Sequence, residues 1–294
     1  MFDYKLLEAF AKVVEEGGFE RAARALCVTQ PAVSQRVRLL EERTGRILLA
    51  RTTPPKPTEA GRLALRHYYR VRRLEDDCQD LFGKDDSGHS ILPVGVNADS
   101  LATWFLPAVT PFLLAERVLL DISVDDQERT HELLRDGGVL GCVSSRPEPF
   151  QGCASAALGS MRYRAFAAPG FRKKWFADGL TMETAAKAPA LIFNRKDELH
   201  QKLLTGVFGS PVPGFQALYL PSSEKFATVI ASGLAYGMLP DQQSAELEAA
   251  GEIVDLAPGF EERVALYWHS WRFGQGLLDR FTEALTAGAK RALA

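Results

Sequence analysis

The stretch Thr29-Gln30-Pro31-Ala32-Val33-Ser34-Gln35-Arg36-Val37-Arg38-Leu39-Leu40 decides how the N-terminal part of the chain folds. Thr29 is a good helix N-cap, and the proline that follows costs nothing because its missing N–H would have no partner in the first turn. Val33, Val37 and Leu40 fall on one side of a helical wheel. The opposite side carries a polar stripe, made of Pro31, Ser34, Gln35 and Arg38.

This polar stripe has the chemistry that reads bases in the DNA major groove. Glutamine pairs with the N6/N7 edge of adenine, arginine with the O6/N7 edge of guanine, and serine with several base edges. A solvated helix face is the alternative interpretation. The proline-stiffened basic segment 51–58 follows the helix and favours DNA binding, because such a hairpin can lie along the phosphate backbone as a wing.

Two shorter helices precede the stretch. Leu6, Phe10 and Val13 repeat at helical spacing until Gly17-Gly18, and a second pattern runs from Phe19 to Leu26. Charge is also concentrated here: residues 21–73 hold 13 Lys+Arg against 3 Asp+Glu, a balance of 13 − 3 = +10, in a chain whose formal net charge is −2. This asymmetry indicates a polyanion-binding module attached to a different domain.

These residues resemble the signature of the LysR family of bacterial transcriptional regulators. The matching segments are 19–23, 28–35, Leu40-Glu41, Arg51 and 57–61. The resemblance implies a winged helix-turn-helix domain at residues 1–60 that binds a double-stranded DNA operator. It also implies a groove-facing set, Thr29, Gln30, Pro31, Ser34, Gln35 and Arg38, and a set near phosphates, Arg51, Lys56 and Thr58.

A long helix is predicted after the wing, at residues 58–82. Ala64, His67, Val71, Leu74, Cys78 and Leu81 alternate three and four residues apart, which predicts a heptad seam. The family resemblance likewise implies a homodimer through this helix, with a tetramer as a larger option. The alternative is a helix that packs only on its own domain. Residues 83–90 are predicted to be a hinge.

The remaining residues, 91–294, predict an α/β effector domain with two lobes, similar to periplasmic binding proteins. Apolar strands at 91–96, 118–124 and 139–143 alternate with helical patterns, and further strands are expected at 163–167, 191–193, 218–220, 237–239 and 264–268. Two crossovers would divide it into lobe I, about 91–162 and 268–294, and lobe II, about 163–267.

Ligands of open α/β sheets lie beyond the carboxyl ends of the strands, so the loops there are candidates for an effector site. Helix starts at Ser100 and Ser223 could hold a carboxylate through backbone N–H groups, and nearby acidic residues could hold a cation. The alternative for each residue is a simple cap or turn. The expected effector-binding set is Asp99, Ser100, Asp125, Asp126, Ser144, Phe193, Asn194 and Ser223.

Five segments of the effector domain resemble the ArgP/LysG subgroup of the LysR family, also called IciA. These are 97–104, 125–127, 141–145, 161–163 and 193–197. The resemblance implies a regulator that senses L-lysine or L-arginine and controls genes for the export or metabolism of basic amino acids. It implies no cofactor beyond this effector, and it leaves RNA polymerase as a further candidate partner.

The rival interpretations are a LysR-type regulator with a different effector, an enzyme that uses Cys142, His131 and the aspartates in the cleft, and a binding protein for transport. The sequence holds no G-x-S-x-G, H-E-x-x-H, P-loop or G-x-G-x-x-G motif, so no enzyme class is favoured. No apolar run reaches the length that spans a bilayer and no signal core opens the chain, so we expect a cytoplasmic protein that does not bind membranes. Cys27, Cys78, Cys142 and Cys153 lack metal-site spacing, and buried free thiols are expected.

Overall fold

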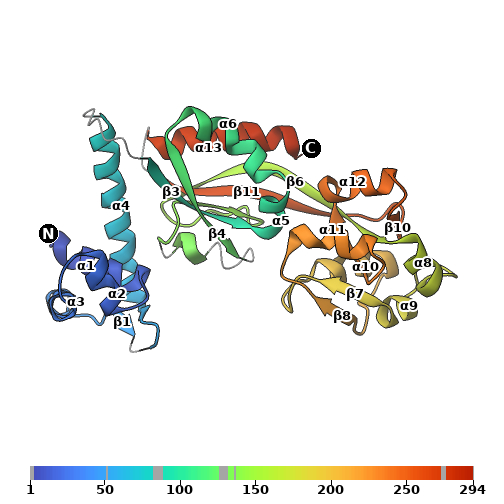
Figure 1. Cartoon of the computed structure of the whole chain (residues 1–294), viewed down its shortest axis with the longest axis horizontal. Helices are drawn as coiled ribbons and strands as arrows, with labels where there is room; N and C mark the ends of the chain where they lie inside the picture. The colour runs from blue at the N-terminus through green and yellow to red at the C-terminus, as the bar shows by residue number, and fades with distance from the viewer. Residues whose placement is uncertain are drawn as a thin grey trace.

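The computed structural model describes residues 3–50, 52–81, 89–125, 132–135, 137–272 and 276–293. A small helical domain lies at one end, a long helix leads away from it, and two α/β lobes follow in a row (Figure 1). The predicted fold class, a winged helix-turn-helix joined to a two-lobed α/β domain, is confirmed.

The N-terminal domain is built on three helices and a short hairpin. The elements are α1 (Tyr4–Glu15), α2 (Phe19–Ala25), α3 (Gln30–Thr44), β1 (Leu49–Ala50) and β2 (Lys56–Pro57). Thr29 caps α3 as predicted, because its hydroxyl accepts a hydrogen bond from the Ala32 N–H at 3.4 Å. Val33, Val37 and Leu40 are buried in the domain core. The sequence pattern therefore predicted the buried side of α3 correctly.

The long helix α4 (Glu59–Leu81) begins where the sequence predicted. Its first turn passes so close to the residue before strand β1 that a Cβ on Gly61 would lie 2.1 Å from the carbonyl oxygen of Leu48. Only glycine permits this approach, which fixes the helix against the wing. Ala64, Leu65 and Tyr68 are buried in the core of the N-terminal domain. Ala64 therefore does not belong to an exposed seam, whereas Leu63 is 55% exposed and Leu74 is 46% exposed.

Lobe I contains three parallel strands in the order β4-β3-β5. Its elements are β3 (Ser90–Asn97), α5 (Ala98–Ala102), α6 (Phe105–Ala115), β4 (Val118–Asp125), β5 (Gly141–Ser144) and α13 (Leu277–Ala292). In the parallel register Asn97 lies opposite Asp125. The carboxyl ends of these strands, where ligands were expected, therefore lie at one edge of the lobe.

Lobe II repeats this arrangement with the strand order β9-β7-β8, in which β7 is parallel to both neighbours. Its elements are α8 (Pro169–Trp175), α9 (Met182–Lys187), β7 (Pro189–Ile192), α10 (Leu199–Phe208), β8 (Gln216–Tyr219), α11 (Ser223–Ala231), β9 (Tyr236–Pro240), α12 (Asp241–Ala249) and β10 (Val254–Asp255).

Two long antiparallel strands, β6 (Cys153–Ala167) and β11 (Glu262–Trp271), run through both lobes. β5 of lobe I pairs with β11 over residues 267–270, and β9 of lobe II pairs with β6 over residues 163–166. The two crossovers predicted between the lobes are thus confirmed. β6 begins earlier than expected because its first half is rich in alanine and serine, which give no strand pattern.

Candidate functional site

The outer face of α3 presents the predicted base-reading stripe. Pro31, Gln35 and Arg38 are exposed. The Gln30 side-chain amide donates to the Ser34 hydroxyl at 2.9 Å, and Arg38 pairs with Glu42 at 2.9 Å. The Arg38 side chain is 82% exposed, so this ion pair is weak and can be exchanged for a base or phosphate.

Glu41 fastens the wing to α3. One of its carboxylate oxygens accepts hydrogen bonds from the backbone N–H groups of Leu48, at 2.7 Å, and Leu49, at 3.2 Å. The two elements that would contact DNA are therefore held in a fixed relation. Lys56 is exposed on β2, where a phosphate contact was predicted.

The other two residues predicted to lie near phosphates have different positions. The Thr58 hydroxyl donates to the Ile47 carbonyl at 2.7 Å and accepts from the Gly61 N–H at 3.1 Å, so it caps α4. Arg51 lies outside the described residues. The phosphate contacts of Thr58 and Arg51 stay predictions.

Asp99 joins the two lobes at the second candidate site. It lies on α5 of lobe I, and its carboxylate accepts hydrogen bonds from the Ser223 hydroxyl, at the start of α11 in lobe II, and from the Tyr163 hydroxyl, at 2.6 Å. Burial, followed by the charge of Asp99, raises the pKa of Tyr163 well above its usual value. Tyr163 therefore remains protonated and can only donate to Asp99.

Close to Asp99 in the sequence, three buried side-chain polar atoms have no hydrogen-bond partner among the described residues. They are the hydroxyl of Ser100, the side-chain carbonyl oxygen of Asn97 and the indole nitrogen of Trp104. Ser100 is 0% exposed. Leaving a buried polar group unpaired costs about 1–3 kcal/mol, so a ligand that satisfies these atoms would recover that free energy.

The remaining predicted effector residues lie at the same strand ends but have local partners. The buried Ser144 hydroxyl accepts from the Arg146 N–H at 3.1 Å, and the Asn194 side-chain oxygen accepts from the Lys196 N–H at 2.8 Å. Phe193 packs on Phe226 with ring centroids 6.5 Å apart. Asp125 is the last residue of β4, and its side chain is not described. Asp126 lies outside the described residues.

Two residues of this site, Tyr163 and Asp197, were not predicted. Asp197 accepts from the backbone N–H groups of Phe193, at 3.2 Å, and Leu199, at 2.9 Å, which shapes the loop after β7. Its pKa is raised mainly by burial, with the charge of Asp99 as a further cause. Both residues stand in segments that carry the subgroup resemblance, and this was the signal that could have found them.

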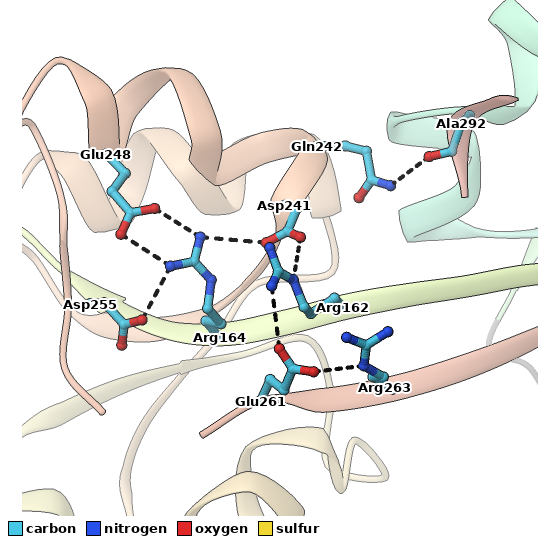
Figure 2. A network of polar contacts seen from close by, with 9 residues as sticks. All are labelled: Arg162, Arg164, Asp241, Gln242, Glu248, Asp255, Glu261, Arg263 and Ala292. Atoms are coloured by element: carbon cyan, nitrogen blue, oxygen red, sulfur yellow. Dashed lines mark hydrogen bonds and ion pairs between the residues drawn. The ribbon is translucent and has the colours of Figure 1, made fainter. Parts of the chain in front are cut away.

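A hollow elsewhere in the effector domain is lined by charges that are already paired (Figure 2). Arg164 binds Glu248 at 2.8 Å and Asp255 at 3.2 Å, and Arg162 binds Asp241 at 2.5 Å. These pairs hold α12 and β10 against strand β6, which runs through both lobes. They leave no free charge for a ligand among the described residues that line it, so the hollow is a weaker candidate than the polar residues around Asp99.

The cysteine thiols do not favour the enzyme interpretation. Cys142 is buried, and burial raises the pKa of its thiol. His131 lies outside the described residues. Cys153 is also buried, but Cys27 is exposed, contrary to expectation, because it follows α2 in a turn with φ of 53°. Among the described residues no group of three or more potential metal ligands occurs.

Comparison with known proteins defines the class of the chain. Residues 4–62 match the family model for the bacterial regulatory helix-turn-helix proteins of the lysR family, and residues 88–290 match the LysR substrate binding domain. The chain therefore belongs to the LysR family of transcriptional regulators, which are DNA-binding proteins and not enzymes.

Within this family the chain falls in the ArgP/LysG subgroup. It is 46% identical over 293 residues to the HTH-type transcriptional regulator ArgP of Pseudomonas aeruginosa, covering 98% of this chain and 96% of the relative. The crystal structure of ArgP from Mycobacterium tuberculosis has a TM-score of 0.89 at 35% identity, covering 100% of this chain and 99% of the other. Full-length LysG from Corynebacterium glutamicum with bound effector Arg has a TM-score of 0.80 at 34% identity, covering 99% of both chains.

The helices also bear on membrane association. In the part of the chain that the structure describes, none of them combines the length and the apolar character that crossing a bilayer requires.

Proposed function

We propose that this regulator senses a basic amino acid, L-lysine or L-arginine, in the cleft between its lobes and controls genes for the export or metabolism of basic amino acids. The observation that carries the proposal is the fully buried hydroxyl of Ser100, which has no hydrogen-bond partner among the described residues and belongs to the residue next to Asp99 in the chain. The bound arginine in the LysG relative supports the same ligand class.

The chemistry of the cleft suits a molecule with opposite charges at its two ends. The Ser100 hydroxyl would donate to the α-carboxylate, with help from Ser144 or from the start of α11 at Ser223. The carboxylate of Asp99 would accept hydrogen bonds from the cationic end of the ligand. Asp125 and Asp126, at and after the end of β4, are the alternative acceptors. A charge-assisted hydrogen bond is stronger than a neutral one, so both ends would contribute.

Effector binding would act by changing the contact between the lobes. The Asp99 carboxylate of lobe I accepts a hydrogen bond from the Ser223 hydroxyl of lobe II, so a ligand cation bound at Asp99 would change the strength of this contact between the lobes. A ligand shifts an equilibrium only by its differential affinity for the two states. A ligand held by both lobes favours the closed state.

The regulator is proposed to act as a homodimer through α4. Leu63 and Leu74 are exposed on this helix, although Ala64 is not, so an interhelical seam would begin at Leu63. Two linked DNA-binding domains bind far more tightly than one. A tetramer and a contact with RNA polymerase are compatible with this arrangement and stay proposals.

The proposal is tested by measuring operator affinity with and without effector. A DNA fragment selected by the full-length protein from a random library is titrated by fluorescence anisotropy, alone and with saturating L-lysine, L-arginine, L-leucine or L-glutamate. We expect only the two basic amino acids to change the Kd. A response to another amino acid alone would favour a LysR-type regulator with a different effector.

A further inference from the structure

The DNA-binding half of the molecule contacts lobe I through one face of α4. Gly137, in the turn before β5, lies against this helix: a Cβ at that position would be 3.2 Å from the Cα of Arg66 and 3.3 Å from the Tyr69 ring. Gly137 also has a φ of +81°, which favours glycine. The turn therefore fits closely against α4.

The second contact is a cation over an aromatic ring. The guanidinium carbon of Arg70 lies 5.2 Å from the centroid of the Trp271 ring. Trp271 is only 3% exposed and is backed by Gly152, whose Cβ would lie 3.1 Å from the ring. The indole is thus held in place by lobe I and offers one face to α4. A cation–π contact of this kind contributes a modest attraction.

Trp271 connects this contact to the effector cleft through a single strand. It is the last residue of β11, and the first residue, Glu262, lies opposite Tyr163 in the antiparallel register. Tyr163 is the residue whose hydroxyl binds Asp99. One end of β11 therefore lies beside Tyr163, which binds Asp99, and the other end lies against α4.

The opposite side of α4 belongs to the DNA-binding domain. Leu65 and Tyr68 are buried in the same core as Val33 and Val37 of α3. A change in how α4 lies on lobe I must therefore move α3 and the wing with it, because close-packed cores shift as units.

We propose that the contact of α4 with lobe I, formed by Arg70 on Trp271 and by the Gly137 turn, is the joint that transmits cleft occupancy to the orientation of the DNA-binding domain within one chain. This inference rests on the proposed effector function. Arg70 and Trp271 are positioning residues: they touch neither the proposed effector nor the proposed base-reading stripe. The helix is either docked on lobe I or released from it, which gives the two states that coupling requires.

Two variants test the joint from opposite sides. Arg70→Gln removes the cation and leaves a shorter, neutral polar side chain. Gly137→Ala adds a Cβ within 3.3 Å of α4 without changing the helix itself. The matched control is Lys174→Gln, which removes a cation 5.3 Å from the centroid of Trp175 on lobe II, away from the joint. Thermal melting and sedimentation check that all three variants fold and assemble like the parent.

The first readout is independent of any effector. The distance between two spin labels within one chain is measured. One label is on Cys27 of the DNA-binding domain, which is exposed, and the other is on Leu114→Cys of α6, a position that is 83% exposed. The labelled chain also carries Cys78→Ser and is diluted with unlabelled chains. We expect a broader or displaced distance distribution for Arg70→Gln and Gly137→Ala, and none for Lys174→Gln. If the distance distributions of Arg70→Gln and Gly137→Ala both equal that of the parent, the proposal that this contact sets the orientation of the DNA-binding domain is wrong.

The second readout measures coupling, as the ratio of operator Kd values without and with L-arginine. Arg70→Gln should bring this ratio closer to one by a factor of about two to five, the factor that corresponds to an exposed cation–π contact. Calorimetric affinity for L-arginine alone should stay near that of the parent. A ratio equal to the parent's would overturn the inference. If the parent protein responds to no amino acid, the proposed function fails, and the label distances alone decide whether the joint exists.

Discussion

The hydroxyl of Tyr163 donates a hydrogen bond to the carboxylate of Asp99 at 2.6 Å, joining the crossing strand β6 to helix α5 of lobe I. The same carboxylate accepts from Ser223 of lobe II. One side chain thus contacts both lobes and a strand that connects them. Changes at Asp99 should therefore affect the relative position of the lobes as well as the binding of a ligand.

Ser100→Ala should separate ligand binding from stability. The Ser100 hydroxyl is buried and has no hydrogen-bond partner in the part of the chain that the structure describes, so its removal should leave the melting temperature of the free protein unchanged or raise it. Affinity for the effector should fall roughly ten- to a hundredfold, since a hydrogen bond to a charged group contributes about 1.5–3 kcal/mol. Calorimetry and thermal melting on the same samples check this. A loss of stability with unchanged affinity would assign Ser100 to the fold alone.

Gln35→Ala should change which sequences the protein prefers. Gln35 is exposed on the outer face of α3, and its loss should cost about 1–3 kcal/mol on the selected operator and flatten the preference at one base position. Lys56→Ala on the wing is the comparison. It should weaken all sequences alike and reduce the salt dependence by about one phosphate contact. Equal losses for Gln35→Ala on operator and random DNA would argue against base reading.

Leu74→Glu should disrupt the dimer. Leu74 is 46% exposed on α4, outside the core of the DNA-binding domain, so the substitution places a charge in the proposed seam without harming the fold. Sedimentation should show monomers, and operator affinity should fall by about a hundredfold or more because two linked modules become one. A dimer that persists would mean that the chains associate through a different surface.

Acid pH should destabilise lobe II through His200. Its ring is buried against Phe215 and Tyr236, and burial lowers the pKa of His200 to about 4. Because the folded pKa lies below the ordinary value of about 6.5, its contribution is fully present above pH 6.5 and is lost as pH falls toward 4. The loss at pH 5 relative to pH 7.5 should be about 2 kcal/mol.

Urea unfolding at the two pH values measures this contribution. His200→Leu removes the titrating ring, so the variant should be less sensitive to pH than the parent by about the same 2 kcal/mol. The carboxylates that titrate in both proteins cancel in this difference. Equal sensitivity in the two proteins would show that His200 does not control acid stability.

The DNA-binding domain could be predicted from sequence because its signals are local. Thr29 caps α3, Val33 and Val37 define the buried face, and the polar residues between them define the exposed one. The strands of lobe I were predicted for a related reason. Each is a short apolar run that alternates with a helical pattern, which predicts parallel strands.

Three features depend on contacts between distant segments and were not predicted. The first half of β6 is too rich in small residues to show a pattern, and it becomes a strand because β11 pairs with it. Ala64 was assigned to an exposed seam, but it packs on the DNA-binding core. The bond from Tyr163 to Asp99 spans 64 residues of sequence, so only the folded chain reveals it.

Calorimetric titration of the full-length protein with each of the twenty amino acids tests the central claim most directly. We expect L-lysine or L-arginine to bind more tightly than every neutral or acidic amino acid, and Asp99→Asn to weaken that binding about tenfold or more by removing the charge that faces the cation. If a neutral amino acid binds the parent as tightly as the basic ones do, or if Asp99→Asn and the parent bind L-arginine equally well, the proposed recognition of a basic amino acid at Asp99 is wrong.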